Sequence, residues 1–322
     1  MSSLLKLSCR TAGLAMSLSL GGRPAAMRRC GLNLFTGMGI ASRTLKILSY
    51  NVSFREDLEM DKRMEAIGDL IQLHSPDLIC FQEVTSRSYC IFQQSRWWKL
   101  YRCSVTEKPT YRQYFCLQLS KLAVKSYIRK PFNNSIMGRV LCVAEVEVQA
   151  DMPLVVASSH LESPCPKWDK MFSKERVDQA KEALNFLKKD VNVIFCGDMN
   201  WDEELDGQFP LPEGWVDAWV QYRPGENGWT FDTKSNQMLS GNWPLQKRLD
   251  RFVCNLRDFK IRRIDMVGME AIPGLSYCKK KLIDMEALPG LSYCKKKGKN
   301  KKLMVPVLPS DHYGLLLTIC IK

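Results

Sequence analysis

The chain has 322 residues, of which 45% are hydrophobic and 25% charged, a composition typical of a globular protein that can bury a core. It contains no run of eighteen apolar residues, so no membrane-spanning helix is expected. The net charge of +13 comes from two flanks, residues 1–46 and 279–302, and the nearly neutral body excludes any argument for a nucleic-acid groove from charge alone.

The first 43 residues are rich in Ser, Arg, Gly and Leu, and the first acidic residue of the chain is Glu56. Such a composition is typical of an organellar transit peptide and also of a disordered leader. Either interpretation leaves residues 44–322 as the folded domain.

Short apolar runs and helical stripes alternate from Lys46 onward. Apolar positions on one helical face predict helices over 61–73 and 173–189. Apolar or alternating runs predict strands at 45–48, 78–81, 115–119, 140–148, 154–159, 191–196, 248–254, 261–264 and 314–321. The alternation over 140–148 indicates an antiparallel strand with one exposed face. This mixture predicts an α/β fold of two packed sheets with helices outside.

One segment is repeated. Ile264 to Lys281 reads IDMVGMEAIPGLSYCKKK, and Ile283 to Lys297 reads IDMEALPGLSYCKKK. Two copies are too few for a solenoid. We interpret them either as a tandem duplication that enlarges a Lys-rich surface loop over 264–302 or as an artefact of the gene model.

Polar motifs stand beside four of the predicted strands. They are Ser49-Tyr50-Asn51, Phe81-Gln82-Glu83, Gly197-Asp198-Met199-Asn200 and Ser310-Asp311-His312. Polar residues at strand ends converge on a crevice in open α/β sheets. Carboxylates, carboxamides and an imidazole together suit metal-assisted attack on phosphate. The motifs therefore predict a phosphodiesterase.

Each polar residue has an expected role. Glu83 is the first candidate for a Mg²⁺ ligand and Asp311 the second, because Mg²⁺ prefers a few carboxylates. Asp198 can accept a proton from a water that Asn200 fixes. His312 can donate to the phosphate, and Asp250 is the expected partner that orients its imidazole.

Residues 46–321 resemble the endonuclease/exonuclease/phosphatase superfamily. The stretches that carry the resemblance are RMEAIGDLIQLHSPDLICFQEV (63–84), SHLESPC (159–165), and residues 192–201, 238–251 and 307–316. They are most similar to the branch that acts on tyrosyl-DNA bonds, and they imply a four-layer α/β sandwich of two mixed sheets flanked by helices.

The resemblance also assigns residues. It implies Mg²⁺, with Mn²⁺ as a substitute, at Glu83 and Asp311, and a phosphate contact from Asn51. By the same resemblance, His160 and Ser163 bind the scissile phosphate, and Phe231 and Leu239 hold DNA against an apolar wall. Asp202 departs from the family pattern, because animal members have Arg at that position.

The expected activity is hydrolysis of the 5′-phosphotyrosyl bond between DNA ends and trapped type-II topoisomerase, in double-strand break repair. The expected partner is a DNA 5′ end with a tyrosyl or topoisomerase peptide adduct, bound by a monomer in the nucleus and away from membranes. Two alternatives stay open: another nuclease of the superfamily, such as an abasic endonuclease or RNA exonuclease, and a catalytically silent nucleic-acid-binding relative.

Overall fold

Two six-stranded mixed sheets form the inside of the protein in this computed structural model. The structure describes residues 43–105, 113–165, 171–239, 245–280 and 302–322. The strand order of the first sheet is β13 (Phe259–Val267), β16 (Gly314–Ile321), β1 (Thr44–Asn51), β2 (Leu78–Val84), β4 (Phe115–Ser120) and β3 (Arg102–Cys103). The order of the second is β5 (Ala123–Pro131), β6 (Val140–Gln149), β7 (Met152–His160), β8 (Asn192–Asp198), β12 (Asp250–Leu256) and β9 (Val216–Asp217).

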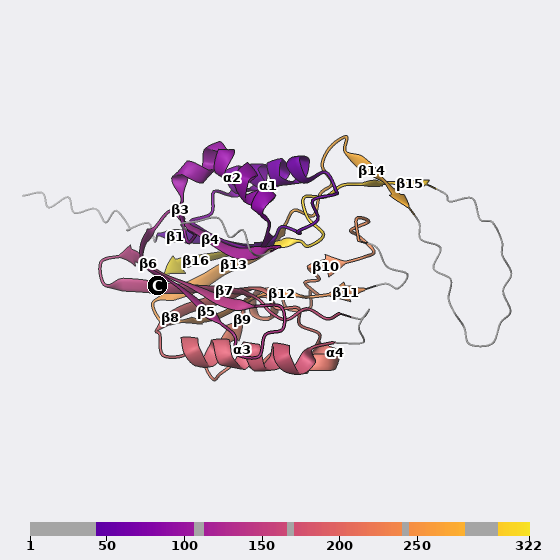
Figure 1. The fold of residues 1–322 in the computed structure, drawn as a ribbon. Helices are drawn as coiled ribbons and strands as arrows, with labels where there is room; N and C mark the ends of the chain where they lie inside the picture. Colours follow the sequence, from indigo (N-terminus) through magenta and orange to yellow (C-terminus); the bar gives the residue numbers. More distant parts are fainter. Residues whose placement is uncertain (1–42, 106–112, 166–170, 240–244, 281–301) are drawn as a thin grey trace, which may run out of the picture. The chain divides into compact units, whose positions relative to one another are not determined.

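Each sheet has one parallel pair of strands near its centre, β1 with β2 and β7 with β8. A parallel pair needs a crossover connection. Helix α1 (Met60–His74) makes the first crossover and α3 (Ser173–Leu187) makes the second. The two helices lie on opposite outer faces of the paired sheets (Figure 1), which gives the layer order helix, sheet, sheet, helix. The predicted four-layer fold is confirmed.

The apolar core is divided among the three interfaces between these layers. Ile47 and Ile194 belong to the cluster between the sheets. Ile67 of α1 packs on the first sheet, together with α2 (Ser86–Gln94), and Leu184 of α3 packs on the second. Both long helices were predicted within two residues of their ends, because each buries one apolar stripe. No helix in the described ranges has the length and apolar character needed to cross a membrane.

Residues 140–148 form an antiparallel strand, as predicted, but the face expected to be exposed is only half-exposed, at Glu145 and Glu147. Strand β6 lies between β5 and β7, so both of its edges are paired. Leu141 and Val143 pack beneath α3, while Ala144 and Val146 face the other sheet. The face toward α3 is therefore buried at the start of the strand and half-exposed toward its end, while the opposite face is buried throughout 140–148.

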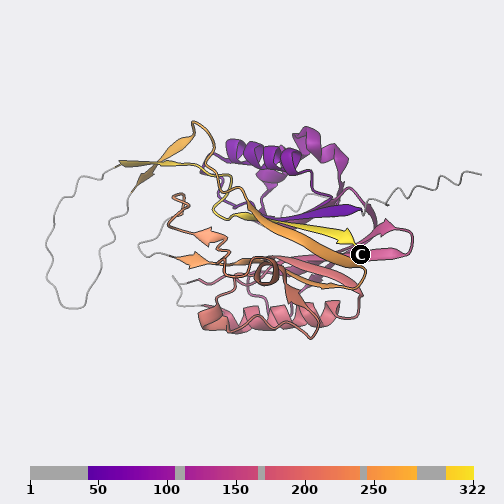
Figure 2. The ribbon, with the colours of Figure 1, turned by 180° about the vertical axis from the view of Figure 1, so that it is seen from behind.

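The predicted loop over 264–302 does not begin at 264. Residues 264–267 are the end of β13, and Ile264 is fully buried. The first copy of the repeat then continues into β14 (Ser276–Lys280), which pairs with β15 (Lys302–Pro306). This ribbon extends from the body (Figure 2, orange and yellow). The second copy and residues 1–42 of the predicted 1–43 leader lie outside the described residues.

Candidate active site

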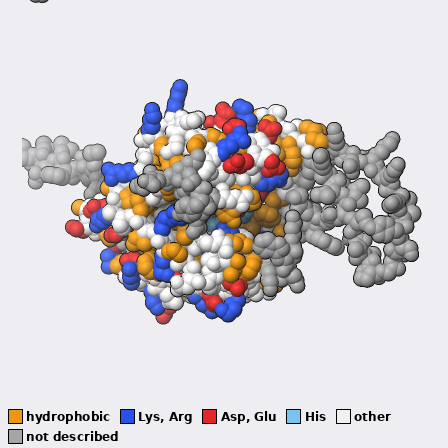
Figure 3. All heavy atoms as spheres, viewed as in Figure 1, with side chains coloured by type: hydrophobic (Ala, Val, Ile, Leu, Met, Phe, Trp, Pro, Cys, Tyr) orange, Lys and Arg blue, Asp and Glu red, His pale blue; other side chains and the backbone are white. Residues whose placement is uncertain are grey.

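The candidate site lies where the carboxyl ends of the two parallel strand pairs meet. Asn51 ends β1, His160 ends β7 and Asp198 ends β8. His160 is the register partner of Asp198 on one side, and Asp250 is its partner on the other. Asn51 Nδ2 donates to Asp198 Oδ2 at 2.9 Å, which joins the two sheets at this edge. Histidine atoms line a hollow on this face (Figure 3).

Asp198 is the centre of this group. Its Oδ1 accepts a hydrogen bond from the Asn200 backbone N–H at 2.9 Å. Its Oδ2 lies 3.4 Å from His160 Nε2 and 3.8 Å from His312 Nε2. Burial alone would raise the pKa of Asp198, but the two histidines and the bonds from Asn200 and Asn51 lower it below its ordinary value. Asp198 is therefore an ionised carboxylate that can accept a proton.

The two histidines around Asp198 have opposite charge states. His312 Nδ1 lies 2.9 Å from Asp250 Oδ2. Burial would lower the pKa of His312, but Asp250 and Asp198 outweigh it and hold that pKa well above its ordinary value. Burial and the Arg139 guanidinium hold the pKa of His160 well below its ordinary value, against the opposing effect of Asp198. At neutral pH the site thus offers a cationic donor and a neutral imidazole.

Ser163 connects His160 to the loop after β8. Its Oγ lies 3.3 Å from His160 Nε2 and accepts from Asn200 Nδ2 at 3.0 Å. Asn200 Nδ2 also donates to the Leu161 carbonyl, so the carboxamide is fixed on the side of His160. His160 and Ser163, the two residues expected to bind the phosphate here, therefore belong to one hydrogen-bonded group with Asn200.

The backbone around the site adopts conformations that most residues avoid. Among the described residues, Ser53, Glu83 and Asn200 have left-handed φ values of 61°, 59° and 47°. Such non-glycine conformations cost about 1–3 kcal/mol each and cluster at functional sites. Gly197 has φ 131°, and a Cβ there would lie 2.0 Å from the Ser159 carbonyl oxygen. Only glycine allows β7 and β8 to pair so closely beside Asp198.

A sequence profile of the Endonuclease/Exonuclease/phosphatase family matches residues 48–312, a range that contains every candidate site residue. The chain belongs to this family. Among curated proteins it is similar to tyrosyl-DNA phosphodiesterase 2 of Rattus norvegicus, with 25% identity over 285 residues that cover 86% of this chain and 67% of the relative. The Homo sapiens enzyme of that name is 27% identical over 282 residues, which cover 85% and 67%. The chain thus spans about two thirds of the length of these relatives.

Solved structures of the family have the same fold. The structure of D. rerio TDP2 complexed with single strand DNA product superposes with a TM-score of 0.67 at 22% identity, covering 86% of this chain and 98% of that one. The human Nocturnin catalytic domain gives a TM-score of 0.58 at 15% identity, covering 87% and 94%.

The family implies a divalent metal, and the donor atoms here fit one. Ligand atoms of Glu83, His160 and Asp198 all lie within 4.8 Å of one another. Burial and the Asp311 charge raise the pKa of Glu83 to about 7, while His312 and a hydrogen bond from the Phe54 N–H oppose the rise. A bound cation would stabilise the ionised form of this buried carboxylate. A second group consists of Asp198, Asp250 and His312, in which His312 Nδ1 and Asp250 Oδ2 already lie 2.9 Å apart as hydrogen-bond partners.

Asp311 occupies a different position from Glu83. It is half-exposed, and its Oδ1 lies 3.3 Å from Ser310 Oγ. It belongs to neither of the two three-residue groups found among the described residues, although its charge acts on Glu83. Its assignment as a metal ligand stays a prediction.

The two residues expected to form the apolar DNA wall differ in their contacts. The Phe231 ring packs edge-on against the His312 imidazole, with ring centroids 5.2 Å apart and planes at 66°. Leu239 is 9% exposed and follows the turn after β10 (Phe231–Asp232), where its N–H donates to the Asn236 carbonyl. Phe231 is thus placed beside a catalytic candidate, and the role of Leu239 stays a prediction.

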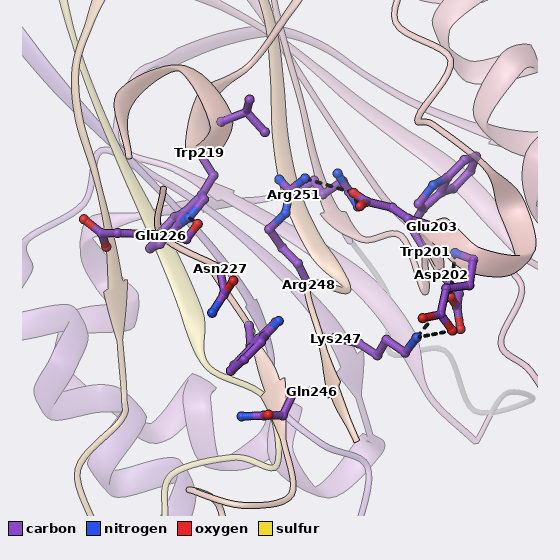
Figure 4. A pocket seen from close by; sticks show the side chains of 13 residues that line it. Trp201, Asp202, Glu203, Trp219, Glu226, Asn227, Gln246, Lys247, Arg248 and Arg251 are labelled. Carbon is purple, nitrogen blue, oxygen red and sulfur yellow. Dashed lines mark hydrogen bonds and ion pairs between the residues drawn. The ribbon is translucent and has the colours of Figure 1, made fainter. Parts of the chain in front are cut away.

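Asp202 has its own partner. It caps the short helix α4 (Glu203–Asp206) and lies 3.1 Å from Lys247 Nζ in β11 (Gln246–Lys247). Both line a cavity of about 390 Å³ (Figure 4) with Trp201, Trp219, Trp229, Arg248 and Arg251 among its other lining residues. Arg248 and Arg251 both pair with Glu203 and Asp217. A lysine from β11 therefore lies beside Asp202, the acid at the position where the resemblance led us to expect an arginine.

Arg139 and Tyr114 were not predicted from the sequence, although they contact Ser163 and His160, the residues expected to bind the phosphate. Arg139 Nη2 donates to Ser163 Oγ at 2.8 Å, and its guanidinium lies 5.5 Å from the Tyr114 ring centre. Tyr114 stacks on His160 with centroids 5.8 Å apart. Each directly precedes a strand that runs antiparallel to a site strand, β4 beside β2 and β6 beside β7. Because such strands begin where their neighbours end, this position is a signal that could have found both.

Proposed function

We propose that this chain is a metal-dependent phosphodiesterase that hydrolyses the 5′-phosphotyrosyl bond between a DNA end and a tyrosine. The observation that carries the proposal is the geometry of the Asp198 centre: its Oδ2 lies 3.4 Å from His160 Nε2 and 3.8 Å from His312 Nε2, and it accepts a hydrogen bond from Asn51 Nδ2. The curated relatives named tyrosyl-DNA phosphodiesterase 2 support the choice of substrate.

Asp198 and Asn200 act on the water. Asp198 accepts a proton as the water oxygen attacks phosphorus, and the Asn200 carboxamide beside it fixes the water's orientation. The Asn51 amide, bonded to Asp198 Oδ2, keeps the carboxylate turned toward the phosphate. The bond between phosphorus and the tyrosine oxygen then breaks, which leaves a 5′-phosphate on the DNA.

The histidines act on the phosphate. His312, held by Asp250, donates to an oxygen on which negative charge develops in the transition state. His160 and Ser163 bind the phosphate on the opposite side of Asp198. A tyrosine phenolate has a pKa of about 10, so it leaves without a general acid, whereas the alkoxide released by a nuclease is far more basic. No further acid is required of this site for the proposed bond.

Glu83 would hold a Mg²⁺ ion, with Mn²⁺ able to substitute, and Asp311 would be the second proposed ligand. The bound ion would neutralise charge on the phosphate and the leaving oxygen. Phe231 and Leu239 form the proposed wall for the DNA beyond the phosphate. The edge-on contact of Phe231 with His312 supports this, because it places an apolar surface directly beside the transition-state donor.

The physiological substrate we propose is a DNA end that carries a topoisomerase peptide, processed by a monomer in the nucleus. The 1–43 leader offers organellar targeting as the competing location. A fluorescent reporter fused to residues 1–43 tests this point. A nuclear or diffuse signal rejects organellar targeting, and an organellar signal rejects the nuclear assignment.

One assay tests the activity. Purified protein is incubated with oligonucleotides that carry a 5′-phosphotyrosyl, a 3′-phosphotyrosyl or an abasic site, with Mg²⁺ or with EDTA. We expect release of tyrosine from the 5′ substrate only, and only with Mg²⁺. Cleavage at the abasic site instead would identify a nuclease of the same family, and binding without cleavage would identify a silent relative.

A further inference from the structure

Arg63 in α1 is a buried cation without an acidic partner. Its side chain is fully buried, and no carboxylate of the described residues lies within ion-pair distance of it. All five of its hydrogen bonds go to backbone carbonyls. Nε donates to Pro309 (3.2 Å), Nη1 to Arg55 (2.9 Å) and Leu58 (3.4 Å), and Nη2 to Val52 (2.7 Å) and Ser53 (3.0 Å).

These carbonyls belong to the two loops that carry the metal side of the site. Residues 52–58 follow Asn51, and the N–H of Phe54 in this loop donates to Glu83 Oε2 at 2.9 Å. Pro309 directly precedes Ser310, Asp311 and His312. Ser310 Oγ in turn donates to the Asn51 carbonyl at 2.6 Å. A single guanidinium therefore links the loop that orients Glu83 to the loop that carries Asp311 and His312.

The charge of Arg63 is not neutralised by an ion pair with any described residue. A buried guanidinium without a partner is costly, and burial lowers the pKa of Arg63 while the nearby charges of Asp311 and Glu83 oppose that shift. Hydrophobic residues could fill the same volume at a lower cost. The arrangement is explained if the guanidinium serves to hold the two loops, because the acceptors of all its side-chain hydrogen bonds are their backbone carbonyls.

We infer that Arg63 is a positioning residue of the metal site: its guanidinium holds loops 52–58 and 309–312 in one arrangement. The inference rests on the proposed function only for its activity readout. Metal binding without substrate tests it independently.

The matched control is Arg176, the other fully buried arginine of a long helix. It sits in α3 on the second sheet and forms two 2.7 Å bonds with the Asp206 carboxylate. It also donates to the carbonyls of Glu162 and Met171, but to neither loop that Arg63 links. A lysine at either position keeps the charge but has three donors on one nitrogen in place of five in a planar fork, so it cannot reproduce the whole set of hydrogen bonds.

The experiment compares Arg63→Lys, Arg63→Met and Arg176→Lys by calorimetric titration with Mn²⁺, by turnover of 5′-phosphotyrosyl DNA and by thermal melting. We expect Arg63→Lys to weaken Mn²⁺ binding about 10–100-fold, the range seen for outer-shell partners of metal sites, and Arg63→Met to weaken it at least as much. Arg176→Lys should lower the melting temperature and leave Mn²⁺ affinity within about threefold. Unchanged Mn²⁺ affinity in folded Arg63 variants, or an equal loss in Arg176→Lys, overturns the inference.

If the Arg63 variants do not fold, hydrogen exchange of the wild-type protein decides. Amides of both loops, 52–58 and 309–312, should gain protection together when Mn²⁺ is added. Protection of one loop or of neither contradicts the inference. A wild-type protein that binds Mn²⁺ with this response but leaves phosphotyrosyl DNA intact would overturn the proposed function and leave the role of Arg63 standing.

Discussion

The two halves of the molecule, each a sheet with the long helix that covers it, share one feature: a buried arginine near the start of that helix. Helices α1 and α3 each have 15 residues, each follows a residue with left-handed backbone, and each buries an arginine at its fourth position. A cation near a helix N-terminus is disfavoured by the helix dipole. In both halves the arginine instead collects carbonyls from the loops around it.

The difference lies in how the charge is balanced. Arg176 forms a buried ion pair with Asp206 within its own half, so its charge is neutralised there. Arg63 has no such partner among the described residues. The carboxylates whose charges raise its pKa are Asp311 and Glu83 of the candidate site. The comparison indicates that the first half gives up some stability to support function, whereas the second uses its arginine for stability.

The largest effect on stability is expected from breaking the buried ion pair between Arg176 and Asp206. Arg176→Met leaves the Asp206 carboxylate buried and unpaired, which should cost about 3–5 kcal/mol of unfolding free energy. The double variant Arg176→Met with Asp206→Leu should recover most of this loss, since the pair is removed as a unit. Urea unfolding measures both. An Arg176→Met protein as stable as wild type would show that the two halves do not differ in this way.

The sequence predicted the elements that build this comparison but not the arginines. Strands such as β1 and β16 and the two long helices were predicted because their apolar patterns are long and continuous. Strand β5 was missed because it is a half-exposed edge strand with charged residues such as Lys125 and Arg129. The link that Arg63 makes between the two loops could not be predicted from the sequence, because its acceptor Pro309 is 246 residues away. Residues that end strands could be assigned to the site from sequence, and residues that reach it from neighbouring layers could not.

The next largest effect is expected at His312, which the first half delivers. His312→Ala removes a donor to developing charge, so turnover should fall about 10²–10³-fold, as for loss of one oxyanion donor. The Mg²⁺ concentration for half-maximal activity should stay nearly constant. Kinetics over a Mg²⁺ series measures both quantities. A shifted metal dependence would mean that His312 acts through the metal site.

Glu83→Gln should separate metal binding from phosphate binding within the same half. The variant keeps the shape of the side chain but loses the charge, so metal affinity should fall by at least about 10–100-fold. Raising the Mn²⁺ or Mg²⁺ concentration should restore part of the turnover. A loss that no metal concentration reverses would argue that Glu83 does not hold the metal.

The smallest effect is expected from the Lys-rich repeat. Deletion of Leu282 to Lys297 removes the second copy, between β14 and β15. The lysines of this copy attract polyanions, and this attraction falls steeply as the salt concentration rises. At physiological salt, turnover of the deletion variant should therefore stay within about tenfold of wild-type turnover, a barrier change below ~1.4 kcal/mol. Turnover of the deletion variant at two salt concentrations checks this. Total loss of activity in a folded variant would place the repeat in the site.

The central claim is that Asp198, where the two halves meet, accepts the proton of the attacking water. Asp198→Asn keeps the size and hydrogen-bond reach of the side chain but removes the base. The most direct measurement is single-turnover cleavage of 5′-phosphotyrosyl DNA by this variant, with DNA binding measured in parallel. We predict a loss of at least about 10²–10⁴ in rate with DNA binding retained. An Asp198→Asn enzyme that cleaves at a rate near that of the wild type would contradict the account.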